Sequence, residues 1–243
     1  MHNPVAHSPV SDALVTFATT PLADHRAQAA AGRAVSQARA SVTKAGDAGR
    51  QIADLLQSQG GAANVARVRA WVLGTVLATQ APSSPSTPVL AAVIAAGEKL
   101  AASDDEIAAA AAIGIEAAAR VLAAVDSEEF RSRWNVASAV GILGAALAVS
   151  RLLKLDDTRT RHALGVAATQ AAGLARNAGE SMAAIEIGKA AADAVEASLL
   201  AKHGFTSAPA SIDGRRGFAA LMAYRFDASL ITEGLGTHWM SLQ

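Results

Sequence analysis

The sequence predicts an all-α fold that forms a single multi-helix domain over residues 1–243. Hydrophobic residues make up 51% of the chain but aromatic residues only 4%, because much of the hydrophobicity is alanine, a strong helix former. No stretch alternates β-branched and polar residues in the manner of a half-buried strand. A chain of this length can bury a sizeable core. We therefore expect a core built by close approach of helices rather than by bulky side chains.

The expected helices follow from apolar spacing and from polar breaks. In chain order, the first half predicts helices over residues 11–20, a helix pair over 23–58 broken near Gly46 to Gly49, and helices over 65–79, 89–101 and 107–125. Ser11 is expected to cap the first helix, and Ser103 precedes three acids that suit a helix start. Residues 1–20 and 232–243 are candidates for flexible ends.

The second half of the chain contains a run without charge, residues 136–149, after an acidic break at residues 126–129. The run is 14 residues long, too short to span a membrane, and predicts a buried central helix. Two amphipathic helices follow, with apolar positions from 164 to 174 and from 185 to 195, joined by the polar break 176–181. This junction is a candidate pocket wall, and a solvated turn between two helices is the alternative.

Composition excludes several classes of function. Lys plus Arg and Asp plus Glu both number 21, so the chain offers no net field to nucleic acid or to an anionic membrane. The absence of cysteine excludes disulfides and thiolate chemistry, and the six scattered histidines lack metal-ligand spacing, so we expect no metal. No nucleotide-binding motif is present and no cofactor is expected. The N-terminus lacks a secretory pattern, which favours a cytoplasmic protein.

Several segments resemble the MmgE/PrpD family, which includes 2-methylcitrate dehydratase and cis-aconitate decarboxylase. The segment RHALGVAATQAAGL at 161–174 is similar to the family's RHALGIAASQASGL, and residues 85–89, 114–120 and 187–218 resemble other family segments. The resemblance covers residues 80–240 and implies the family's helical domain, with metal-independent proton abstraction and bond cleavage on small polycarboxylates. It also implies that an α+β lid domain would begin where this sequence ends, so lid-borne groups are expected to be absent from it.

The chain departs from the family pattern at its polar positions. The histidine directly before the proline is Ser84, the Gly-Trp-His motif reads Arg133-Trp134-Asn135, and the Lys-x-x-His spacing reads Ala183 and Glu186. The family's Asp-Asp-Thr-His run is missing as well. An amide cannot titrate as an imidazole does. We therefore do not expect standard 2-methylcitrate dehydration.

Two classes of function follow from these observations. The first is a divergent lyase or isomerase with a repurposed acid/base pocket for a small organic substrate, in which Glu186 is the acid or base and Asn135 stabilises an oxyanion. We expect Ser84, Asn135 and Glu186 to converge on one cavity, shielded by Trp134. The substrate-binding candidates are Ser84, Ser86, Trp134, Ser138, Arg176, Ser181 and Lys189.

The second class is a non-catalytic domain that binds a small molecule or pairs with a lid-bearing relative. Simpler roles are open for single residues: Glu186 with Lys189 as a helix-surface pair, Asn135 as an N-cap, and Arg176 with Glu180 as a solvated pair. A homodimer is also expected. Family members are dimeric, and Ala- and Gly-rich helices such as 136–149 can pack on both faces.

Overall fold

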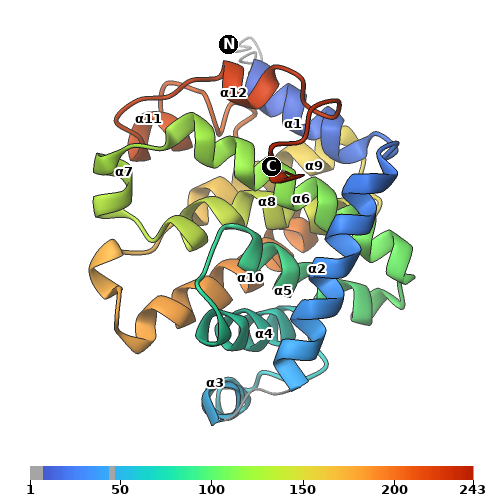
Figure 1. The fold of residues 1–243 in the computed structure, drawn as a ribbon, viewed down its shortest axis with the longest axis vertical. Helices are drawn as coiled ribbons and strands as arrows, with labels where there is room; N and C mark the ends of the chain where they lie inside the picture. Colours follow the sequence, from blue (N-terminus) through green and yellow to red (C-terminus); the bar gives the residue numbers. More distant parts are fainter. Residues whose placement is uncertain (1–7, 44–46, 243) are drawn as a thin grey trace.

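The computed structural model describes residues 8–43 and 47–242, and this part of the chain is all-α as the sequence predicts (Figure 1). The elements are α1 (Pro9–Thr19), α2 (His25–Thr43), α3 (Asp47–Ser58), α4 (Ala66–Gln80), α5 (Ser86–Leu100), α6 (Asp104–Val125), α7 (Glu128–Arg133), α8 (Val136–Leu152), α9 (Asp157–Gln170), η1 (Ala175–Asn177), α10 (Ser181–Lys202), α11 (Phe218–Met222), α12 (Ser229–Thr232) and η2 (Met240–Leu242). Within the described ranges the only β-type pairing is an isolated bridge between Trp134 and Leu174.

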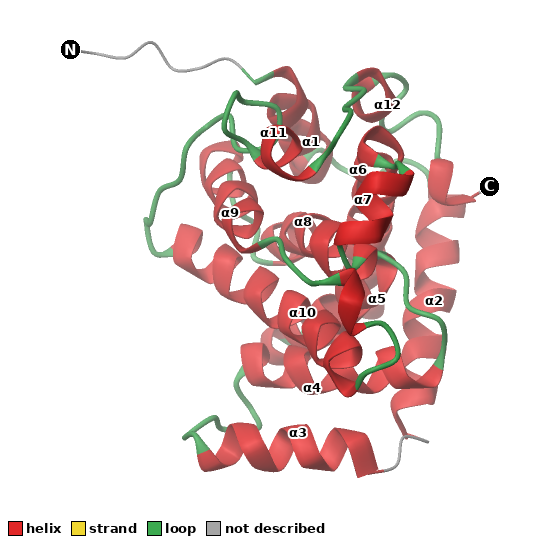
Figure 2. Cartoon of the chain, turned by 90° about the vertical axis from the view of Figure 1, so that its left-hand side faces the viewer, coloured by secondary structure: helices red, strands yellow, loops and turns green. Residues whose placement is uncertain are grey.

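Helix α8 is the centre of the fold, as the charge-free run predicts. Every residue from Ala137 to Ser150 is buried, and α5, α6, α9 and α10 pack around the helix. Figures 1 and 2 show these helices surrounding it, with α3 lying at one end against α4. Helices of the same chain cover all sides of α8, so α8 offers no surface to a second copy. The expectation that α8 packs against a partner chain in a dimer is therefore not met.

Close approach of helices explains why alanine and glycine dominate the core. A Cβ atom on Gly74 of α4 would lie 2.7 Å from the Cα atom of Gly188 on α10. A Cβ atom on Gly114 of α6 would lie 2.7 Å from the carbonyl oxygen of Gly144 on α8. At both crossings, the missing side chain lets two backbones touch.

The polar residues that begin the helices agree with the sequence at most positions. Ser103 and Glu106 form a full capping box at the start of α6, in which the Ser103 backbone N–H lowers the pKa of the Glu106 carboxyl. The cap of α1 is Ser8 rather than Ser11, because Pro9 at the first helical position needs no N–H partner and the Ser8 hydroxyl accepts the Ser11 N–H. Ser11 itself is buried inside α1.

Three further boundaries differ from the expectation. The acidic break after α6 contains a short helix, α7, whose start Ser127 caps by accepting the Phe130 N–H. The break in the 23–58 pair falls before Asp47, so Gly49 lies inside α3, while Gly46 lies outside the described residues. Helix α9 ends at Gln170, so residues 171–174 form part of a loop rather than the helix's last turn.

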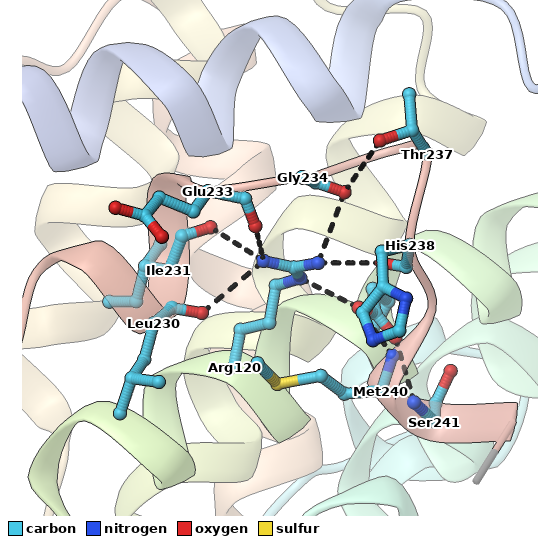
Figure 3. A network of polar contacts seen from close by, with 10 residues as sticks. Arg120, Leu230, Ile231, Glu233, Gly234, Thr237, His238, Met240 and Ser241 are labelled. Atoms are coloured by element: carbon cyan, nitrogen blue, oxygen red, sulfur yellow. Dashed lines mark hydrogen bonds and ion pairs between the residues drawn. The ribbon is translucent and has the colours of Figure 1, made fainter.

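The C-terminal segment is held by a buried ion pair on α6 (Figure 3). Arg120 and Glu116 are both fully buried and lie 2.7 Å apart, from Nε to Oε1. The Arg120 guanidinium donates to the carbonyl oxygens of Leu230, Ile231, Glu233, Gly234 and His238. Glu116 accepts the backbone N–H groups of Met240 and Ser241 at 3.0 and 2.9 Å. Segment 114–120, noted in the sequence for its family resemblance, therefore serves to fasten residues 230–241.

Of the helices in the described ranges, α6 alone is long and apolar enough to cross a membrane by length and composition, and 72% of its apolar window is buried inside the protein. Its middle also carries the Glu116–Arg120 pair. These contacts make it a core helix of this fold.

Candidate functional site

A cavity of about 680 Å³ lies where the α9–α10 connection meets the start of α8 and the end of α4. Figure 1 shows this connection beside α7. The polar lining is Thr79, Ser83, Arg131, Asn135, Glu180 and Ser181, and the larger apolar side chains are Trp134, Leu174 and Ile187. The polar break recognised in the sequence thus forms one wall of a cavity.

Asn135 is both the N-cap of α8 and a contact to α10. Its Oδ1 accepts the Ser138 N–H at 3.5 Å, as a helix cap does. Its Nδ2 donates to Glu186 Oε2 at 3.1 Å and to the Ala183 carbonyl oxygen at 3.3 Å. An amide nitrogen has two hydrogens. Both are engaged here, so in this conformation Asn135 orients Glu186 and has no hydrogen left for a substrate oxyanion.

Glu186 is half-buried on α10, and its carboxylate accepts three N–H groups. Besides Asn135, the Asn177 side-chain amide donates to Oε1, and the Leu174 backbone N–H reaches the same oxygen at 3.4 Å. This donor set fixes the orientation of the carboxylate. It also joins α8, η1 and α10 at one point.

The loop between α9 and η1 is fitted against the start of α8. The Asn135 N–H donates to the Gly173 carbonyl oxygen at 3.0 Å, and the Ser138 hydroxyl donates to the Ala172 carbonyl oxygen at 2.8 Å. Gly173 has φ +118°, and a Cβ atom there would lie 3.0 Å from the Asn135 Cβ atom. Residues 172–173 are therefore packed against α8, whereas residues 178–181 of the polar break are exposed, so the junction combines a cavity wall with a solvated turn.

The remaining candidates divide between this cavity and other places. Trp134 and Ser181 line the cavity, and the Trp134 indole N–H donates to the Met222 carbonyl oxygen at 3.1 Å. Ser138 lies behind Asn135. Arg176 is exposed on η1, does not line the cavity, and forms no ion pair with Glu180 in the described part of the chain.

Ser84, Ser86 and Lys189 lie away from the Asn135–Glu186 pair. The Ser84 and Ser86 hydroxyl oxygens are 2.7 Å apart at the start of α5, and Ser86 lines a separate cavity of about 170 Å³. Of Ser84, Asn135 and Glu186, expected to converge on one cavity, only Asn135 lines it. Ser84 is held at the helix start and Ser83 lines the cavity instead, while Glu186 is bonded to Asn135 but is not part of the lining. Lys189 pairs with Asp193 rather than with Glu186.

Two features set the charge of the cavity. Arg131 forms an ion pair with Asp126, and this side-chain hydrogen bond raises the pKa of Arg131. Helix α10 begins at Ser181 without a side-chain cap, so its first N–H groups contribute a partial positive charge beside the cavity. Because Arg131 is paired with Asp126 and the other charged lining residue, Glu180, is an acid, the cavity suits a small polar molecule.

Three residues that contribute to the site were not predicted from the sequence. Asn177 belongs to the polar break but has no spacing that indicates a contact with Glu186. Ser83 and Arg131 lie on other elements, and only the fold brings them to the cavity. Among the described residues, no three His, Asp or Glu side chains gather as a metal ion would require.

Comparison with known proteins adds to this geometry. The family model of the MmgE/PrpD N-terminal domain matches residues 77–230, which include the junction, Asn135 and Glu186. Cis-aconitate decarboxylase from Homo sapiens is 35% identical over 112 residues, which is 46% of this chain and 23% of that enzyme. Cis-aconitate decarboxylase from Aspergillus terreus is 29% identical over 175 residues, which is 66% of this chain and 36% of that enzyme. The matches thus span well under half of these relatives. With most of its helices inside the matched region, the chain belongs to the MmgE/PrpD family.

Proposed function

We propose that this chain provides the helical part of a metal-independent lyase or isomerase site that acts on a small organic substrate, with Glu186 as the proton acceptor. The observation that carries the proposal is the contact of 3.1 Å by which Asn135, a lining residue of the cavity at the start of α8, holds Glu186 on α10 directly behind that lining. In this arrangement Asn135 and Asn177 are positioning residues for the carboxylate. The N–H groups at the start of α10 and the Ser181 hydroxyl, which border the cavity, would donate to the substrate's oxygens.

A second candidate function rests on the same carboxylate. Because three N–H groups already occupy Glu186, its role is equally that of a fastener for the loop, which would leave a cavity that binds without catalysis. The partner of such a binding module would be a lid-bearing relative or a second copy of the chain. Leu174, Leu221 and Tyr224 are large apolar side chains that are exposed in this chain, and such side chains support contact with a partner. We also propose a cytoplasmic location.

Substitution of the carboxylate distinguishes the two functions. The assay is deuterium incorporation from D2O into a panel of small carboxylic and hydroxy acids, followed by proton NMR, which detects proton abstraction whatever the later step. We expect Glu186→Gln to lower the exchange rate by about 100-fold or more, the contribution typical of a general base. We also expect it to cost about 1–2 kcal/mol of unfolding free energy, because the new amide points N–H groups at existing donors.

The matched control is Glu180→Gln, which removes an exposed carboxylate that lines the cavity but is not bonded to Asn135, and it should leave exchange unchanged. Exchange that survives in Glu186→Gln would reject the assigned base. Binding of a panel member without exchange, and with similar affinity in both variants, would establish the non-catalytic function.

A further prediction concerns the relatives' reaction. The purified chain is expected not to release CO2 from cis-aconitate, and not to dehydrate 2-methylcitrate, at ordinary enzyme rates of about 1 per second. Four positions correspond by resemblance to the family's titratable groups, and here they are Ser84, Asn135, Ala183 and Glu186. Only Glu186 of these four carries an acid or a base. Human cis-aconitate decarboxylase assayed in parallel is the positive control. Turnover by this chain at the control's rate would show that the departures do not matter.

A further inference from the structure

A second, larger cavity of about 890 Å³ lies on the other side of Trp134, between α9, α11 and the loop after α10. Trp134 is part of the lining of both cavities. The lining of the second cavity includes both apolar and cationic side chains. Val166, Phe218, Leu221 and Met222 supply an apolar side, while Arg215 and Arg216 supply a cationic one.

The loop that carries the arginines is anchored at both ends. The Asp213 carboxylate accepts the Ser8 hydroxyl and the Val10 N–H, which ties the loop to the start of α1. The Ser207 N–H donates to His162 Nδ1 at 3.1 Å, which ties it to α9. After Asp213, the Gly217 N–H donates to the Gly214 carbonyl oxygen at 2.7 Å in a tight turn, and the Phe218 N–H donates to the Ser211 carbonyl oxygen at 2.8 Å. Residues 207–217 therefore hold a defined shape.

Charge in this cavity is one-sided. None of the described residues that line it is acidic, and neither Arg215 nor Arg216 forms an ion pair or hydrogen bond with another described residue. The nearest acid in sequence, Asp213, is already bonded to α1. Two guanidinium groups without a counter-ion match the planar fork of a carboxylate, while the apolar side matches a hydrocarbon.

We propose that this cavity binds an amphipathic organic carboxylate, with its charged group at Arg215 and Arg216 and its hydrocarbon against Phe218, Leu221 and Met222. This ligand class differs from the small polar molecule inferred for the first cavity. Glu186 is not part of this site. A failure of the proposed function would therefore not contradict binding here, and a failure of binding here would not contradict the proposed function.

The probe for the proposal is octanoate, compared with octanol and with acetate. Binding is followed by two-dimensional amide NMR on the whole chain. We expect saturable shifts of residues 206–217 and of the Trp134 indole N–H with octanoate, and much weaker binding of octanol, which lacks the charge, and of acetate, which lacks the chain. The double variant Arg215→Gln and Arg216→Gln should raise the Kd for octanoate by about tenfold or more, since bonds to charged groups are the strong ones.

Two controls make the result specific. Arg33→Gln removes an exposed arginine on α2, which lies on the opposite side of the molecule from α11 (Figures 1 and 2), and should leave the Kd unchanged. Leu221 is 71% exposed, so Leu221→Ser should fold normally and weaken octanoate binding without affecting acetate. Shifts confined to residues 174–184, equal binding of octanol and octanoate, an unchanged Kd in the double variant, or no saturation up to about 5 mM would each overturn the proposal.

Discussion

Arg120→Met is expected to lower the free energy of unfolding by about 3–5 kcal/mol, the range seen when one partner of a buried ion pair is removed. The substitution leaves the Glu116 carboxylate fully buried without its counter-ion. It also removes the N–H donors of several carbonyl groups between Leu230 and His238. Methionine fills a similar volume, so the loss is one of charge and hydrogen bonding rather than of packing.

Denaturant unfolding followed by circular dichroism measures this effect, and the chain provides a matched control. Arg69 pairs with Glu98 at 3.0 Å, but the side chains are 39% and 43% exposed. Arg69→Met should therefore cost less than about 1 kcal/mol. If Arg120→Met proved as mild as Arg69→Met, the network of Figure 3 would not stabilise the fold.

The double variant Glu116→Gln with Arg120→Met tests the cause of the loss. Glutamine keeps an oxygen for the Met240 or Ser241 N–H but carries no charge. If an uncompensated buried charge dominates, the double variant is more stable than Arg120→Met alone. If lost hydrogen bonds to residues 230–238 dominate, the second substitution recovers nothing.

The fold could be predicted because its signals are local. The charge-free run identified α8 as the central helix, and the Ser103-Asp104-Asp105-Glu106 pattern identified the start of α6. The same kind of pattern, Ser127 followed by two acids, precedes α7, but six residues are too few to show a helical period. The end of α9 gave no local signal. Bonds from Asn135 and Ser138 to the carbonyl groups of Gly173 and Ala172 hold the chain there in an open loop.

The site could be predicted only in part, because its members come from separate elements. The sequence placed Asn135 and Glu186 together through family resemblance, since nothing in the 51-position separation between them indicates a contact. The pairing of Glu116 with Arg120 could be predicted from the sequence. Two opposite charges four residues apart among alanines indicate a pair on a buried helix. Their partners at residues 230–241 have no such signal.

Helices α6 and α8 pack closely because Gly114 and Gly144 meet at their crossing, and this contact permits a prediction of similar size. A Cβ atom on Gly144 would lie 2.8 Å from the Ala118 Cβ atom and closer still to the Gly114 carbonyl oxygen. Neither obstacle is the end of a flexible side chain, so the helices themselves must separate. Gly144→Ala is therefore expected to cost about 3 kcal/mol, at the upper end of ordinary overpacking penalties.

Gly32→Ala is the matched control, because the same methyl group added to α2 would meet only the Ala108 Cβ atom at 3.5 Å, an ordinary contact. Alanine restricts the unfolded chain and favours helix, so this variant should gain about 0.5–1 kcal/mol. Denaturant unfolding of both variants against the unsubstituted chain gives the comparison directly. Close packing predicts a loss of stability at Gly144 and a gain at Gly32, whereas helix propensity alone predicts a gain at both positions. A Gly144→Ala variant as stable as Gly32→Ala would mean that α6 and α8 do not touch through their backbones at this point.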